Sequence, residues 1–226
     1  MINGIRVKIC GLTSLVDAEA ADAAGADFLG FIFHAASPRR ILREQFRAMA
    51  ERLPPRKKVA VCVEPSVADL AEYDRLGCDC FQVHFRPDTP LPALSAWSQF
   101  AGHARLWLAP KLPPGSRFNA DWLPLTNTFL IDTFHPEKFG GTGETGDWAG
   151  FRRLSEAHPQ KTWILSGGLK PDNIAAAIAA TGAKFVDVNS GVEVSPGVKD
   201  PAKLKALVLA LRRATTPADN PADRSR

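Results

Sequence analysis

Long hydrophobic runs are absent from this sequence of 226 residues. No apolar stretch approaches the ~18 residues that a membrane-spanning helix requires, so we expect no membrane partner. The first ten residues, MINGIRVKIC, are a short polar lead into a strand and do not resemble a secretory signal. These absences favour a cytoplasmic protein.

Cysteine is scarce, with four residues in the whole chain: Cys10, Cys62, Cys78 and Cys80. Their spacing fits no zinc pattern, and one residue between Cys78 and Cys80 is too few for a C-x-x-C redox pair. We therefore expect no metal site. The ordinary interpretation is buried free thiols in a reducing compartment, and Cys10 is the exception argued below.

A strong charge of either sign is also missing, because the formal net charge is only +4. The arginines are spread along the chain and do not cluster with aromatic residues, so we expect no nucleic-acid partner. A small anionic substrate fits this charge. The 45% hydrophobic and 23% charged residues are ordinary for a globular protein with a large core.

Short apolar runs alternate with amphipathic stretches along the chain. Such alternation predicts parallel strands joined by crossover helices, with helices covering both strand faces. Eight units in about 210 residues indicate an α/β fold of the (β/α)₈ TIM-barrel type, at the compact end of its size range. The eight strand candidates are RVKIC, FLGFIF, KVAVCV, CFQVHF, RLWLA, TFLIDTF, TWILSG and FVDVNS.

We expect a single barrel domain over residues 1–213 and a disordered tail over 214–226, which has no apolar periodicity. Boundary signals support the helices: Thr13 or Ser14 can cap the first, and Gly25 falls where that helix should end. The Pro-rich segment 113–126 predicts at most a short helical turn.

A G-x-G-x-x-G pattern is formed by Gly141, Gly143 and Gly146. A dinucleotide-binding turn should follow its strand directly and be followed by an acidic residue at the end of the next strand. Here HPEKFG intervenes, and the next strand ends in Ser-Gly-Gly. We therefore interpret Gly141 and Gly143 as parts of a lid loop over the barrel mouth.

Glycine-rich turns follow the seventh and eighth strands. Gly167 and Gly168 come after the seventh strand, and Asn189, Ser190 and Gly191 come after the eighth. In barrels of this kind, backbone N–H groups of these two turns commonly hold a phosphate. The alternative is that the glycines only permit tight turns, but their presence at both positions favours a phosphate site.

Cys10 and Asp132 end the first and sixth strands. Because side chains alternate faces, Cys10 shares a face with Lys8, and Asp132 shares one with Leu130. An unpaired buried carboxylate is costly, so Asp132 must be paired, protonated or at the mouth. Each residue alone is more often structural, but together beside a phosphate site they indicate a base and an acid.

The motifs VKICG, SPR, DTF, KFGGTGETGDW, SGGLKPDNI and VDVNSGVEVSPGVKDP resemble the phosphoribosylanthranilate isomerase family of tryptophan biosynthesis. The resemblance covers nearly the whole chain in order. It implies a (β/α)₈ barrel that performs an Amadori rearrangement of a small phosphosugar–anthranilate substrate, with no cofactor or metal.

The resemblance also implies roles for individual residues. It makes Cys10 the general base and Asp132 the general acid, and it places Arg39 of the SPR motif at the anthranilate carboxylate. Asp187 matches an aspartate near the reacting centre, and the two glycine turns match the phosphate site. A free thiol is only a few per cent thiolate at neutral pH, so we expect Lys8 or nearby N–H groups to lower the pKa of Cys10.

Three positions depart from the family pattern. Phe85 stands where glycine is common, His34 where tyrosine is common, and Gly146 where an aromatic is common. Phe85 puts the geometry of its loop in question. His84 is interpreted as a structural residue near the mouth rather than an acid or base.

Three other functions remain open on the residues alone. The first is a Schiff-base aldolase using Lys8 or Lys184, and the second is the histidine-pathway sugar isomerase, which has aspartate where this chain has Cys10. The third is a phosphate-binding barrel without catalysis, because a fold does not fix a function. We expect a monomer or a homodimer.

Overall fold

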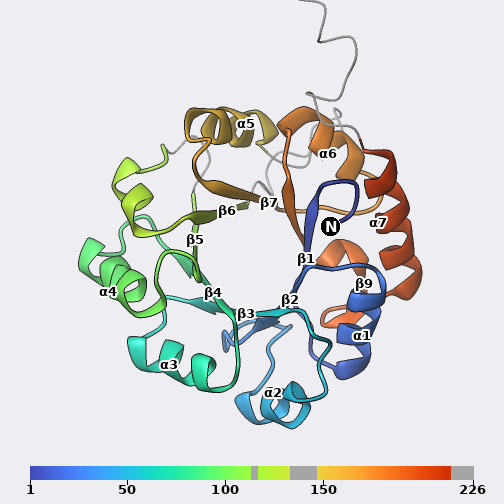
Figure 1. Ribbon diagram of the computed structural model, residues 1–226, viewed down its shortest axis with the longest axis horizontal. Coiled ribbons are helices and arrows are strands. Elements are labelled where there is room, and N and C mark those ends of the chain that lie inside the picture. The colour runs from blue at the N-terminus through green and yellow to red at the C-terminus, as the bar shows by residue number, and fades with distance from the viewer. Residues whose placement is uncertain (113–116, 133–146, 215–226) are drawn as a thin grey trace, which may run out of the picture.

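The computed structural model describes residues 1–112, 117–132 and 147–214. Within them, eight parallel strands close into a barrel in chain order, and β1 pairs with β8. The prediction of a (β/α)₈ barrel is confirmed, and Figure 1 shows the strands ringed by helices. The strands are β1 Arg6–Ile9, β2 Phe28–Ile32, β3 Lys57–Val63, β4 Cys80–Phe85, β5 Leu106–Pro110, β6 Thr128–Asp132, β7 Thr162–Ser166 and β8 Phe185–Val188.

The helices follow the strands on the outside of the barrel. They are α1 Leu15–Ala23, α2 Arg43–Ala50, α3 Val67–Arg75, α4 Leu91–Ala101, α5 Trp148–Ala157, α6 Ile174–Thr181 and α7 Pro201–Arg213. Between β5 and β6 the described residues hold only the 3₁₀ helix η1 Ala120–Leu125, as the Pro-rich segment predicted.

Local signals explain several of these boundaries. Ser14 caps α1 by accepting the N–H of Asp17, so of the two candidates Ser14 is the cap. Gly25, after the same helix, has φ of 87°, a left-handed conformation that glycine adopts without a side-chain clash. The chain therefore turns there from α1 towards β2.

The apolar core has two parts. The larger lies between the strands and the surrounding helices, and the smaller fills the inside of the barrel. Phe28, Trp107 and Phe185 pack against one another in the inner part, with ring centroids 5.0 to 5.5 Å apart. This layer fills the barrel interior below the functional groups, which lie at the carboxyl ends of the strands.

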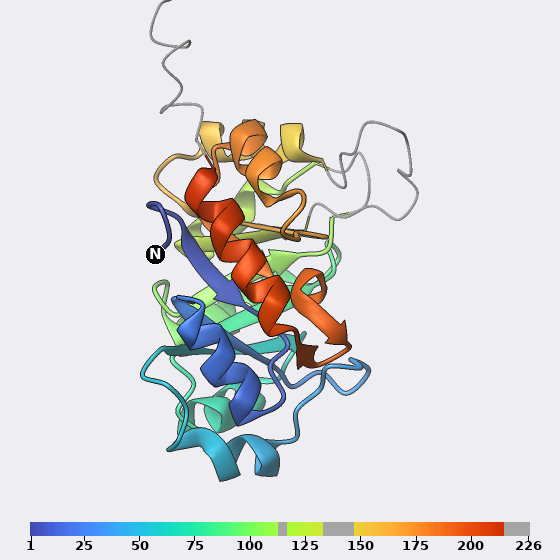
Figure 2. The same ribbon diagram turned by 90° about the vertical axis from the view of Figure 1, so that its right-hand side faces the viewer.

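An addition to the barrel lies between β8 and α7. The 3₁₀ helix η2 Ser190–Val192 leads into an antiparallel hairpin of β9 Glu193–Ser195 and β10 Val198–Lys199. Figure 2 shows this hairpin beside the start of α7, with α1 alongside. The hairpin was not among the predicted elements.

The last described segment of the chain ends at Ala214, directly after α7. Ala214 is buried, and its carbonyl accepts a 2.7 Å hydrogen bond from Asn3. Residues 215–226 lie outside the described residues, so the division into a barrel of 1–213 and a tail of 214–226 stays a prediction. None of the described helices is both long and apolar enough to span a membrane.

Candidate active site

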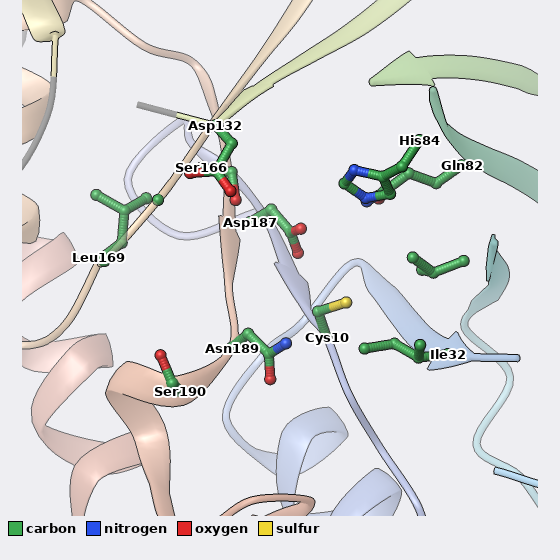
Figure 3. A pocket seen from close by; sticks show the side chains of 13 residues that line it. Cys10, Ile32, Gln82, His84, Asp132, Ser166, Leu169, Asp187, Asn189 and Ser190 are labelled. Carbon is green, nitrogen blue, oxygen red and sulfur yellow. The ribbon is translucent and has the colours of Figure 1, made fainter. Parts of the chain in front are cut away.

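A cavity of about 300 Å³ opens at the carboxyl ends of the barrel strands. Figure 3 shows its side chains converging from β1, β4, β6, β7 and β8. Seven residues singled out from the sequence line it: Cys10, Asp132, Gly167, Gly168, Asp187, Asn189 and Ser190. The fold therefore brings residues that are up to 180 positions apart along the chain into one cavity.

Cys10 lies beside a buried ion pair. Lys8 and Asp187 face each other across the β1–β8 pairing, and Lys8 Nζ lies 2.9 Å from Asp187 Oδ1. The Lys8 side chain is 0% exposed and that of Asp187 6%. Gly30 on β2 leaves the room for Lys8, because a Cβ there would lie 2.8 Å from Lys8 Cε.

The charges around Cys10 correct one expectation. Burial raises the pKa of the Cys10 thiol, and the opposing effect of Lys8 only partly offsets it, so the pKa is raised rather than lowered. Burial also opposes the charge on Lys8, but Asp187 and Cys10 together outweigh it and raise the Lys8 pKa. Lys8 therefore stays cationic and, with a smaller contribution from Lys199, favours a thiolate at Cys10.

Asp132 is the last residue of β6 and pairs in register with Ser166 at the end of β7. It is exposed, whereas Leu130, two residues earlier on the same face, is buried inside the barrel. Asp132 is therefore at the mouth, which is one of the situations that its sequence context allowed. It faces the same cavity as Cys10, across from β1 (Figure 3).

The two glycine turns lie side by side on one wall. Gly167 and Gly168 have φ of 101° and 61°, and the chain there bends across the cavity edge. Gly191 does not line the cavity. A Cβ at Gly191 would collide with the carbonyl oxygen of Leu169, so this glycine lets the second turn pack against the first.

Arg39 also lies outside the cavity lining, although it is close by. A Cβ on Gly11, next to Cys10, would lie 2.9 Å from Arg39 Cδ and 2.6 Å from Asn189 Oδ1. The Arg39 guanidinium is bound to Glu193 of the hairpin at 2.8 to 3.0 Å. Gly141 and Gly143 of the expected lid loop, like Gly146, lie outside the described residues.

Gln82 was missed by the sequence reasoning, and His84 lies at the mouth, as predicted. Gln82 and His84 alternate along β4 and face inwards, and Gln82 Nε2 lies 2.8 Å from His84 Nε2. Burial lowers the His84 pKa to about 4, so the ring is neutral at physiological pH. Gln82 Oε1 is buried without a hydrogen-bond partner in the described part of the chain. The alternation of inward residues along β4 could have identified Gln82 from His84.

The position of the Phe85 side chain explains how the fold accommodates phenylalanine where the family commonly has glycine. Its side chain is buried on the outer face of β4, where it packs edge-on against Trp122 at 5.1 Å and Trp97 at 6.3 Å. It therefore points away from the cavity. The phenylalanine ring fills space between β4 and the helices α4 and η1, and the neighbouring His84 lines the cavity.

The fold and the cavity define a class of protein. A closed (β/α)₈ barrel with a thiol, two carboxylates and paired glycine turns at the carboxyl ends of its strands is typical of an enzyme acting on a small phosphorylated compound. Neither candidate lysine is in position to form a Schiff base with a substrate in the cavity. Lys8 forms an ion pair with Asp187, and Lys184 precedes β8 at the opposite end of the barrel.

Comparison with known proteins gives the family. The family model for N-(5'-phosphoribosyl)anthranilate (PRA) isomerase matches residues 7–210. The PRA isomerase of Pseudomonas fluorescens is 39% identical over 215 residues, which cover 93% of this chain and 97% of the relative. The chain belongs to the PRA isomerase family, as the sequence motifs indicated.

Solved structures agree with this assignment. The crystal structure of the Thermus thermophilus PRA isomerase has a TM-score of 0.75 and 32% identity, and the match covers 92% of this chain and 98% of that one. Another PRA isomerase, with a TM-score of 0.71, 28% identity and coverage of 92% and 98%, was solved with reduced 1-(o-carboxyphenylamino)-1-deoxyribulose 5-phosphate. That compound carries both a carboxylate and a phosphate.

Proposed function

We propose that this chain catalyses the Amadori rearrangement of N-(5-phosphoribosyl)anthranilate to 1-(2-carboxyphenylamino)-1-deoxyribulose 5-phosphate in tryptophan biosynthesis. The observation that carries the proposal is that Cys10 and Asp132 face one cavity from β1 and β6, beside the glycine turns after β7 and β8. The reaction needs a proton donor, a proton acceptor and a phosphate-binding site. We assign these functions to Asp132, Cys10 and the two glycine turns.

In the first step, Asp132 donates a proton to the furanose ring oxygen. The bond between C1 and this oxygen breaks, and the nitrogen lone pair forms a C1=N bond. Asp132 must therefore be protonated when the substrate binds. The cationic Schiff base that results makes the C2–H acidic, which prepares the second proton transfer.

In the second step, the thiolate of Cys10 removes the C2 proton, and the electron pair moves to neutralise the C1=N bond. Protonation at C1 and loss of the enol proton then give the ketone, so the atoms balance as an isomerisation. Lys8 assists because its charge opposes the rise that burial causes in the Cys10 pKa. Asp187 keeps Lys8 in place through the 2.9 Å ion pair.

The other residues hold the two ends of the substrate. Gly167, Gly168 and the Asn189–Ser190–Gly191 turn form the proposed phosphate site, and Arg39 is the proposed partner of the anthranilate carboxylate. Asp187 lines the same cavity as Cys10, and we assign it a place near the reacting carbons. We retain the lid loop with Gly141 and Gly143, and the absence of a cofactor, as predictions.

The same assignment extends to the setting of the enzyme. All four cysteines are free thiols, which supports the cytoplasm as its compartment. A monomer or a homodimer stays a prediction.

The test is turnover of variants that each lose one proton-transfer group. We expect Cys10→Ala and Asp132→Asn each to lower kcat by at least ~100-fold, the lower end for a positioned acid or base. Cys80→Ala is the matched control, because Cys80 is another thiol inside the barrel but lies in the apolar layer away from the cavity. Near-native kcat in Cys10→Ala or Asp132→Asn would contradict the assignment.

A further inference from the structure

The β9–β10 hairpin carries a buried ion pair that the reaction scheme does not use. Glu193 and Lys199 pair in register across the hairpin, and Lys199 Nζ lies 2.9 Å from Glu193 Oε1. The Glu193 side chain is 4% exposed and that of Lys199 0%. Removing two charges from water is costly, so a pair kept at this depth must be well satisfied by its surroundings.

Glu193 is satisfied by two cations at once. Besides Lys199, its carboxylate accepts bonds from Arg39 Nε at 2.9 and 3.0 Å and from Arg39 Nη2 at 2.8 Å. The N–H of Gly197 adds a fourth donor at 3.2 Å. Although burial opposes its charge, Arg39 and Lys199 together lower the Glu193 pKa, so the carboxylate is ionised at neutral pH.

This contact fixes one edge of the Arg39 guanidinium. Nε and Nη2 are both engaged by Glu193, whereas no partner of Nη1 is found in residues 1–112, 117–132 or 147–214. Because a guanidinium is planar and rigid, anchoring one edge sets the direction of the remaining N–H groups. A second carboxylate can therefore be bound at Nη1 without displacing Glu193.

Lys199 acts in the same way on Asn189, which lines the cavity. Lys199 Nζ lies 3.1 Å from Asn189 Oδ1 and 3.4 Å from the Asn189 carbonyl oxygen. An ammonium group only donates, so the amide oxygen must face Lys199 and the NH₂ group must face the other way. Figure 3 shows this orientation, with the nitrogen of Asn189 directed into the cavity towards Cys10.

Arg39 and Asn189 therefore receive their orientation from neighbouring residues of one hairpin. They also meet at Gly11, where a Cβ would collide with both side chains. The series Arg39, Glu193, Lys199 and Asn189 thus runs as alternating donor and acceptor groups from the SPR loop to the phosphate turn. Both of its ends offer N–H donors beside the cavity.

We propose that Glu193 and Lys199 are positioning residues for the two anionic ends of the substrate. Glu193 orients Arg39 for the carboxylate, and Lys199, bound to both oxygens of Asn189, holds in place the turn that offers its N–H groups to the phosphate. This inference rests on the proposed function. It predicts that the hairpin sets the selectivity for a substrate with both anions. The competing explanation is that the ion pair only holds the hairpin against the barrel.

The test for Glu193 compares two substrates, N-(5-phosphoribosyl)anthranilate and N-(5-phosphoribosyl)aniline, which lacks the carboxylate. In Glu193→Gln the guanidinium loses its charged anchor. The native preference in kcat/KM for the carboxylated substrate should then fall roughly 10- to 100-fold, the effect of one charge-assisted hydrogen bond. The aniline compound should change little.

The test for Lys199 uses inorganic phosphate and anthranilate as separate competitive ligands. Lys199→Met should raise the Ki of phosphate about 10-fold and leave that of anthranilate within about twofold. Lys199→Arg should recover most of the phosphate affinity, because a guanidinium also only donates. Raised KM with nearly unchanged kcat is expected in Lys199→Met.

Asp17→Asn is the matched control for the hairpin. Asp17 accepts the backbone N–H of Lys199 at 3.0 Å without touching Arg39 or Asn189. Loss of the Asp17 charge should therefore lower the Tm but leave unchanged both the substrate preference in kcat/KM and the ratio of the Ki values for phosphate and anthranilate. Equal loss on both substrates in Glu193→Gln, or equal loss of both ligands in Lys199→Met, would overturn the proposal. Failure of the native protein on both substrates, with phosphate and anthranilate still bound, would instead contradict the proposed function.

Discussion

Substituting Gly30 by alanine tests the arrangement around Cys10 with a single methyl group. Gly30 lies outside the left-handed region, so its backbone accepts alanine without strain. The added Cβ would lie 2.8 Å from Lys8 Cε, 2.9 Å from Lys8 Nζ and 3.1 Å from Cys10 Cα. An ordinary carbon contact is about 3.5 Å, so Lys8 must move by at least ~0.7 Å.

Two effects should follow from this displacement. Overpacking of a dense interior costs about 1–3 kcal/mol, which for a chain of this size lowers the Tm by roughly 2–12 °C. Displacing Lys8 also weakens its electrostatic interaction with Cys10, which is the interaction that opposes the rise in the Cys10 pKa. The thiol then ionises at higher pH, so the rising limb of kcat/KM against pH shifts upwards and the loss of activity is greatest at low pH.

The assay is the pH profile of substrate consumption, followed by loss of anthranilate-type fluorescence, alongside thermal unfolding. Gly77→Ala is the control, because Gly77 has φ of 88° and nothing apart from its chain neighbours lies within 4 Å of where its Cβ would be. Strain there should cost about 1–2 kcal/mol without changing the pH profile. A Gly30→Ala protein with native Tm and a native pH profile would refute the reasoning.

Three further predictions concern the walls of the site. Gly191→Ala should abolish measurable phosphate binding, because the new methyl collides with the carbonyl of Leu169 and separates the two glycine turns; calorimetric titration with phosphate at the native affinity would contradict this. Phe85→Ala should lower the free energy of unfolding by about 3–5 kcal/mol by emptying the space against Trp122, and urea denaturation showing less than about 1 kcal/mol would argue against it. Gln82→Met removes the unpaired buried acceptor at nearly equal volume but also the 2.8 Å contact with His84, so it should lower the free energy of unfolding by no more than about 1 kcal/mol; urea denaturation showing a loss above about 3 kcal/mol would contradict this.

The barrel could be predicted because its signals are local. Eight apolar runs alternate with helical patterns, and residues such as Ser14 and Gly25 mark where the helices begin and end. Side chains alternate between the two faces of a strand, so Cys10 must lie on the same face as Lys8, and Asp132 on the same face as Leu130. Chain order then places their strand ends around one mouth, and this is why the cavity contains them.

The remaining features depend on contacts between distant segments. The hairpin strands are three and two residues long, too short to give a periodic signal, and the bond from Arg39 to Glu193 crosses 154 positions. The direction of the Cys10 pKa was predicted wrongly, because burial in the folded chain outweighs the charge of Lys8. No sequence pattern gives that balance.

The most direct test of the central claim is turnover of N-(5-phosphoribosyl)anthranilate, formed in situ and followed by its fluorescence, with the native protein, Cys10→Ala and Cys80→Ala side by side. We predict rapid loss of fluorescence with the native and Cys80→Ala proteins and at least ~100-fold slower loss with Cys10→Ala. No turnover by the folded native protein, or equal turnover by all three, would contradict the account.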